Sequence, residues 1–141
     1  MNYESPQNMP VAVYGSLRFG GGNDGIWTDR PGVQSIGLGT VAGVSLRYHH
    51  TGFPYGMPED GYNAVVEVIT ADSEAWPMLV ARLDRLEGHP SFYTRTQRTV
   101  TMDNGLEFTA WTYLILDGYA ADMERVPGND WLNVNPWVVG A

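Results

Sequence analysis

Glu87 is the carboxylate of this chain with the most unusual sequence position. It falls in the last turn of a predicted helix, directly before Gly88, where the terminal carbonyl groups already present a partial negative charge. Ionisation is disfavoured there, and burial against an apolar cavity would raise its pKa from about 4.3 toward neutrality. Such a carboxyl group can take and return a proton near neutral pH. The alternative is a solvated charge paired with Arg85, Arg95 or Arg98.

A second candidate is the run Tyr14-Gly15-Ser16-Leu17-Arg18, which follows a predicted strand. Where a strand ends in a tight turn of small residues, successive backbone N–H groups can converge on one point and bind an anion or a developing oxyanion. The alternative is an ordinary connection, because Gly and Ser are common turn residues. Taken alone, the run does not decide between the two.

The composition excludes several other kinds of catalytic and binding site. All eight basic residues are arginine, which excludes Schiff-base lysines, and the absence of cysteine excludes thiol nucleophiles and disulfides. A formal net charge of −8 repels nucleic acid and anionic membranes. His49 and His50 would point to opposite faces of a strand, so we expect no metal site. With no signal peptide or long apolar run in view, we expect a soluble, cytoplasmic protein.

The glycine and proline content indicates strands and turns more than a helical bundle. The 141 residues include 17 glycines and 9 prolines, and 43% of them are hydrophobic. We predict a single domain over residues 1–141, in which residues 1–9 form a loose N-terminal arm. Small and apolar residues alternate within residues 33–48 and predict two curved strands there, while residues 51–60 are predicted to be a loop.

Further strands are predicted at residues 10–14, 62–69, 93–102 and 106–116, with Asp103-Asn104-Gly105 as a hairpin turn. One helix is predicted to begin between residues 73 and 77 and to end at Leu86, before Gly88. Its buried face would consist of Leu79, Leu83 and Leu86. Asp84 on this helix is expected to pair with a nearby arginine.

The order of these motifs resembles the gamma-glutamyl cyclotransferase-like family, and in particular its small gamma-glutamylamine cyclotransferase-type members. The resemblance rests on Tyr14-Gly15-Ser16-Leu17-Arg18 with Asn23 after it, on Leu83-Asp84 and Glu87-Gly88-x-Pro90, on Tyr93-x-Arg95, and on Trp111-Thr112-Tyr113. These motifs stand in the family's order and at about its spacing. The implied fold is α+β, a small curved or closed β-barrel of about six to seven mostly short strands with one or two flanking helices.

The resemblance also implies a reaction. The α-amine of a γ-glutamyl amine or small γ-glutamyl peptide would attack its own γ-carbonyl, which releases 5-oxoproline and a free amine. Glu87 would be the general acid and base of this amide-cleaving acyl transfer, and no metal or organic cofactor would be required. The substrate-binding residues that the resemblance implies are Gly15, Ser16 and Leu17 through their backbone amides, Tyr14 and Tyr113 at the pocket wall, and also Tyr93 and Asn23.

The chain departs from the family near its C-terminus. The family often has a Gly-Asp-Trp turn here, and this chain has the longer run Gly128-Asn129-Asp130-Trp131. The resemblance therefore does not predict how this segment runs over the pocket. The C-terminal segment, with Trp131 and Trp137, is expected to pack over the core. The alternative function is a binding or interaction module that holds a γ-glutamyl or amino-acid-like ligand without turnover. The oligomeric state and the identity of the substrate are not predicted.

Overall fold

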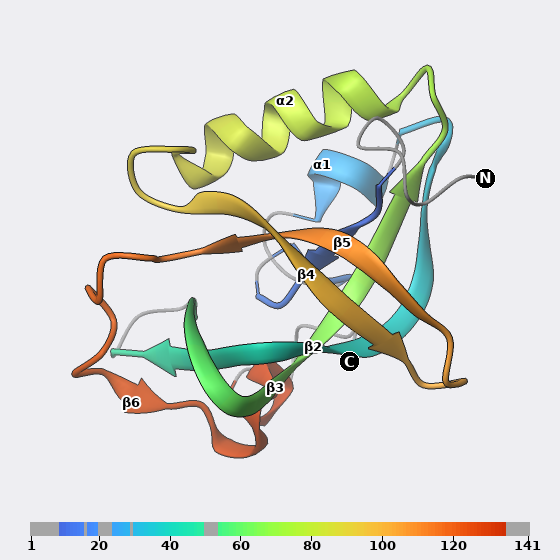
Figure 1. The fold of residues 1–141 in the computed structure, drawn as a ribbon. Helices are drawn as coiled ribbons and strands as arrows, with labels where there is room; N and C mark the ends of the chain where they lie inside the picture. The colour runs from blue at the N-terminus through green and yellow to red at the C-terminus, as the bar shows by residue number, and fades with distance from the viewer. Residues whose placement is uncertain (1–8, 16, 20–23, 29, 50–53, 135–141) are drawn as a thin grey trace.

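The computed structural model describes residues 9–15, 17–19, 24–28, 30–49 and 54–134 (Figure 1). The sheet is built from six strands, which are β1 (Val11–Val13), β2 (Val33–Tyr48), β3 (Tyr55–Ala71), β4 (Thr94–Met102), β5 (Glu107–Leu114) and β6 (Glu124–Arg125). Two α-helices, α1 (Gly25–Thr28) and α2 (Trp76–Glu87), are followed near the C-terminus by short 3-10 turns at Pro127–Asn129 and Trp131–Asn133.

Five of the strands close into a mixed β-barrel. Their order is β3-β1-β5-β4-β2, and β2 pairs again with β3, so that the sheet returns to its first strand. Only the β1–β5 pairing is parallel among the described strands, and β6 is an extra strand added beside β2. Helix α2 crosses the outside of the barrel, with α1 between the helix and the strands in the view of Figure 1. The predicted α+β barrel is confirmed.

The prediction of two strands within residues 33–48 was wrong, because β2 is one continuous strand. Its pairing with β3 shifts register between Ser35 and Gly37 and again between Ala42 and Val44. Gly37 and Gly43 have φ values of 112° and 75°, which only glycine adopts without strain, so the glycines bend the strand and do not interrupt it. This bending lets one long strand contribute to two sides of the barrel.

The predicted loop at residues 51–60 was wrong from residue 55 onward. Residues 55–60 belong to β3, in which Tyr55 pairs with Arg47 and Pro58 with Val44. The proline lies next to the second bulge of β2, where ladder hydrogen bonding is already irregular, so its missing N–H is tolerated. Residues 51–53 lie outside the described part of the chain.

Helix α2 begins within the predicted window, but one residue of its buried face differs. Leu79, Val80 and Leu83 are buried, whereas Leu86 is 43% exposed, which contradicts the prediction for that side chain. At about 100° per residue, positions 79, 80, 83 and 87 fall within one stripe and position 86 lies at its edge. The helix geometry therefore turns Glu87, and not Leu86, toward the barrel.

The β4–β5 hairpin was predicted correctly. Residues 94–101 of β4 pair with residues 107–114 of β5, and Gly105 in the turn has a φ of 90°. One group of buried side chains fills the barrel and includes Trp131 from the C-terminal segment, which is 1% exposed. A second group lies between the barrel and the helices. Trp137 lies outside the described residues, as do residues 1–8 of the predicted N-terminal arm.

Met9 is already part of the packed structure. Its side chain is 3% exposed, and its carbonyl accepts a hydrogen bond of 2.9 Å from Trp76 Nε1 on α2. Over the described residues, no helix has the length and apolar character needed to cross a membrane.

Candidate active site at the end of helix α2

Glu87 is the last residue of α2, and the helix ends beside it as the sequence predicts. Gly88 adopts a left-handed conformation with φ 70°, and its N–H donates to the carbonyl of Arg85 at 3.3 Å. Burial raises the pKa of Glu87 from 4.5 to about 7. A carboxyl group of this kind exists in both protonation states near neutral pH, as the sequence analysis anticipated.

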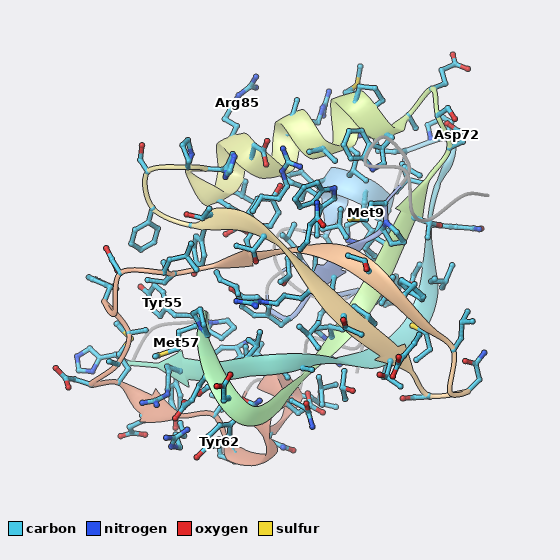
Figure 2. All side chains as sticks on the ribbon, in the orientation of Figure 1. Met9, Tyr55, Met57, Tyr62, Asp72 and Arg85 are labelled. Atoms are coloured by element: carbon cyan, nitrogen blue, oxygen red, sulfur yellow. The ribbon has the colours of Figure 1, made fainter. Side chains whose placement is uncertain are left out.

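The alternative of an ion-paired Glu87 is not found among the described residues. Arg95 binds Asp84 instead, with its Nε 3.0 Å and its NH2 3.4 Å from the two carboxylate oxygens. Arg85 extends away from the barrel in Figure 2. The predicted structural role of Asp84 is confirmed by this ion pair, and Arg95 also stacks on Trp111 with 4.4 Å between its guanidinium carbon and the ring centroid.

Three buried tyrosines lie within electrostatic range of Glu87. Burial chiefly, and the negative charge of Glu87 in addition, raise the pKa values of Tyr14, Tyr93 and Tyr113. The three phenols therefore stay neutral over the range in which Glu87 titrates. The structure thus brings together four of the predicted site residues. Tyr14 directly follows β1, Glu87 ends α2, Tyr93 directly precedes β4, and Tyr113 lies in β5.

Each tyrosine hydroxyl has a fixed partner. Tyr14 donates to the carbonyl of Tyr113 at 2.6 Å and accepts from the N–H of Gly56 at 3.1 Å. Tyr93 donates to the carbonyl of Pro54 at 3.2 Å, and Tyr113 donates to Asp84 Oδ1 at 2.6 Å. These bonds orient the rings around the carboxyl group. The partners at Pro54 and Gly56 were missed from the sequence, because that segment was expected to be a loop.

The loop after β1 is held closely against the barrel. A Cβ on Gly15 would lie 2.7 Å from Cδ of Pro54, so only glycine fits there without a shift. The carbonyl of Leu17 accepts a 2.6 Å hydrogen bond from Trp27 Nε1. The N–H groups of Gly15 and Leu17 donate to no acceptor among the described residues. Ser16 and Asn23, two other predicted site residues, lie outside the described residues.

The C-terminal segment anchors this loop. The side chain of Arg18 is fully buried, and its NH1 atom lies 2.8 Å from Asp130 Oδ1. The preceding residue, Asn129, has a φ of 55° and bonds β2 through both side-chain atoms, to the N–H of Leu46 at 2.7 Å and the carbonyl of Val44 at 2.8 Å. The lengthened turn is therefore fixed on the barrel.

Residues 11–133 match the family described as "Gamma-glutamyl cyclotransferase, AIG2-like". The chain belongs to this family. The matched range includes the loop after β1, Glu87 and all three site tyrosines.

Proteins similar to this chain occur in distant organisms. A protein of Methanocaldococcus jannaschii named "Putative gamma-glutamylcyclotransferase" is 33% identical over 107 residues, 73% of this chain and 81% of that protein. A Drosophila melanogaster protein with the same name is 30% identical over 112 residues, 74% of this chain and 68% of that protein. The crystal structure of a mouse AIG2-like protein has a TM-score of 0.68 at 20% identity and shares the fold over 84% of this chain and 86% of that chain.

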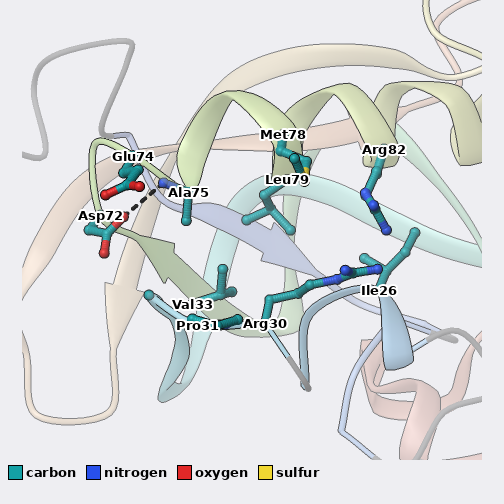
Figure 3. A pocket seen from close by; sticks show the side chains of 11 residues that line it. Ile26, Arg30, Pro31, Val33, Asp72, Glu74, Ala75, Met78, Leu79 and Arg82 are labelled. Atoms are coloured by element: carbon teal, nitrogen blue, oxygen red, sulfur yellow. Dashed lines mark hydrogen bonds between the residues drawn. The ribbon is translucent and has the colours of Figure 1, made fainter.

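This gamma-glutamyl cyclotransferase-like chain also has a concave region near the start of α2, and Glu87 does not line it. It is a cavity of about 340 Å³ with Arg30 and Arg82 at one end and Asp72 and Glu74 at the other (Figure 3). Asp72 Oδ1 accepts a hydrogen bond from the N–H of Ala75 at 2.8 Å and so belongs to the start of the helix. No group of three or more His, Cys, Asp or Glu side chains suited to a metal ion occurs in the described part of the chain.

Proposed function

We propose that this chain is a cyclotransferase that converts a γ-glutamyl amine or a small γ-glutamyl peptide into 5-oxoproline and the free amine. The observation that carries the proposal is the half-buried carboxyl group of Glu87, which has no ion-pair partner among the described residues and whose pKa is raised by desolvation to about 7. A group that both accepts and returns one proton works best with a pKa near the working pH. Membership in the gamma-glutamyl cyclotransferase family supports the same reaction.

In the proposed reaction the α-amino nitrogen of the substrate bonds to its own γ-carbonyl carbon, and the γ-amide C–N bond then breaks. Glu87 takes the proton from the attacking amine and delivers it to the leaving nitrogen, so the carboxylate is restored at the end of the cycle. Because the nucleophile is tethered to its electrophile, the protein mainly orients the substrate and moves this proton.

The loop after β1 is proposed to bind the oxygen atoms of the substrate's glutamyl group. The backbone amides of Gly15, Ser16 and Leu17 would donate to the substrate carboxylate or to the oxyanion that forms at the γ-carbon. The N–H groups of Gly15 and Leu17, which donate to no acceptor among the described residues, support this role. Pro54 packs against Gly15 and limits how far the loop can move.

The tyrosines are assigned to the pocket wall. Tyr14, Tyr93 and Tyr113 are neutral, and their hydroxyl protons already bond the protein, so they shape the space around Glu87 and do not compete for the transferred proton. The low polarity that they create supports the raised pKa of the carboxyl group. Asn23 completes the proposed set of substrate-binding residues.

The test is to incubate wild type and Glu87→Gln with a panel of γ-glutamyl amines and dipeptides and to follow 5-oxoproline by mass spectrometry. Gln keeps the shape of the side chain and removes its acid and base function. We expect wild type to turn over at least one substrate about 100-fold or more faster than Glu87→Gln, because proton transfer typically contributes that much. Glu74→Gln, an exposed change before the same helix, is the control with wild-type activity. Binding of a panel member without product from wild type would favour a binding module instead.

A further inference from the structure

Beside the proposed site, four aromatic rings form a continuous group, here named the aromatic cluster, which consists of Tyr55, Phe92, Tyr93 and Tyr119. Tyr55 stacks on Tyr93 with ring centroids 6.2 Å apart and an angle of 14° between the planes. Phe92 meets Tyr93 edge-on at 5.0 Å and Tyr119 at 5.6 Å. Tyr119 in turn contacts Tyr55 at 5.8 Å, so the four rings close on one another.

Three separate segments of chain hold the cluster together. Tyr55 begins β3, Phe92 and Tyr93 lie between α2 and β4, and Tyr119 follows β5. The N–H of Ile115 bonds the carbonyl of Gly56 at 2.8 Å, which brings the end of β5 beside the start of β3. In Figure 2, Tyr55 lies below the connection from α2 to β4. The rings are therefore positioned by the barrel and do not form a chance contact within one loop.

The cluster has a buried floor and an open rim. Tyr55 and Tyr93 are each 7% exposed, whereas Phe92 and Tyr119 are 44% and 56% exposed. The rings of Phe92 and Tyr119 are both exposed and contact each other, so together they form one apolar surface at the rim of the cluster. Leaving two adjoining rings in water forgoes about 25 cal/mol for each Å² of apolar surface that a ligand would cover.

The cluster adjoins the proposed proton shuttle directly. The N–H of Tyr93 donates to the carbonyl of Glu87 at 3.2 Å, and the N–H of Phe92 donates to the carbonyl of Gly88 at 2.9 Å. The negative charge of Glu87 also helps to raise the pKa of the Tyr93 hydroxyl, after burial, which is the larger cause. A substrate nitrogen that accepts a proton from Glu87 therefore carries its substituent within reach of these rings.

We propose that the aromatic cluster binds the substituent of the leaving amine, and that the preferred substrates are γ-glutamyl derivatives of apolar, aromatic amines. The inference rests on the proposed cyclotransferase function and specifies its substrate class. Planar apolar groups gain from edge and face contacts with such rings beyond the area that they bury. The leaving group is thus recognised by ring contacts and not by charge.

The charges around the site disfavour a leaving amine that carries a carboxylate. Arg95, on the strand that follows the cluster, is ion-paired with Asp84. Arg47 and Arg125 are both ion-paired with Glu59. An α-amino acid as leaving group would bring a carboxylate to a protein of net charge −8 without a free guanidinium from these three residues.

The inference is tested by comparing kcat/KM for γ-glutamylbenzylamide, γ-glutamylmethylamide and γ-glutamylalanine. We expect wild type to favour the benzylamide over the other two by roughly 10- to 100-fold. Phe92→Ala and Tyr119→Ala should each bring the benzylamide-to-methylamide ratio down toward one, whereas Tyr119→Phe, which keeps the ring, should retain it. Leu106→Ala, an exposed change in the β4–β5 turn, is the matched control and should keep the wild-type ratio.

The outcomes separate this inference from the proposed function. Equal efficiency with all three substrates, a preference for γ-glutamylalanine, or an unchanged ratio in both alanine variants would overturn the inference and leave the cyclotransferase reaction standing. No 5-oxoproline from any of the three with folded wild type would overturn both. Because Phe92 and Tyr119 are exposed, their variants are expected to stay folded, with a cooperative thermal melting curve.

Discussion

Replacing Glu87 with Gln should change the stability of the protein in a way that depends on pH. Burial raises the pKa of Glu87 from 4.5 to about 7, so the folded protein resists ionisation of this carboxyl group and the unfolded chain does not. Well below pH 4.5 the carboxyl group is protonated in both states and does not lower the free energy of unfolding. The destabilisation develops between about pH 4.5 and about pH 7 and is fully present above that range. Gln cannot ionise and escapes this destabilisation.

The size of the effect follows from the pKa shift. A change from 4.5 to about 7 corresponds to between about 3 and 4 kcal/mol once the group is fully ionised. At pH 5 only about 1 kcal/mol of this is present, so the free energy of unfolding of Glu87→Gln relative to wild type should rise by about 2 to 3 kcal/mol between pH 5 and pH 8.5. The other ionisable groups are the same in both proteins, so their contributions cancel when the two free energies of unfolding are subtracted.

The assay is urea denaturation of both proteins at several pH values, with Glu74→Gln as a control on an exposed carboxylate before the same helix. The stability difference between Glu74→Gln and wild type should change much less with pH. A difference for Glu87→Gln that is flat from pH 5 to pH 8.5, or that falls, would refute the desolvated carboxyl group on which the proposed chemistry depends.

Three further outcomes follow from the same structure. Gly15→Ala should destabilise the protein by about 1–3 kcal/mol in urea denaturation, because its Cβ would lie 2.7 Å from Cδ of Pro54, whereas Gly25→Ala, with no atom within 4 Å, should not. Tyr14→Phe should cost about 1–3 kcal/mol in the same assay, since two buried backbone groups lose their partner; full stability would show that these bonds contribute nothing. For wild type, kcat/KM should fall as pH drops through about 7, because Glu87 must be ionised to accept the amine proton; a flat profile between pH 5 and pH 8 contradicts that role.

The position of Glu87 could be predicted because the signals that determine it are local. Gly88 ends the helix through a left-handed conformation that a glycine readily adopts, and a period of 3.6 residues sets which positions face the barrel. The same period, applied to the whole helix, assigns Glu87 and not Leu86 to the buried stripe.

The surroundings of the carboxyl group could not be predicted, because they depend on pairings between distant segments. Pro54 and Gly56 bond the site tyrosines, yet their residue types indicate a loop when read alone. The ion pair between the buried Arg18 and the partly exposed Asp130 joins residues 112 positions apart. Such contacts are set by closure of the barrel, for which a single sequence carries no local signal.

The most direct test of the account is a product balance with purified wild type and a γ-glutamyl amine. The proposed reaction yields 5-oxoproline and free amine in equal amounts with no glutamate, and an N-acetylated substrate, whose α-nitrogen is no longer nucleophilic, yields neither. Release of amine together with glutamate, or cleavage of the N-acetylated substrate, would show attack by water and contradict the intramolecular mechanism.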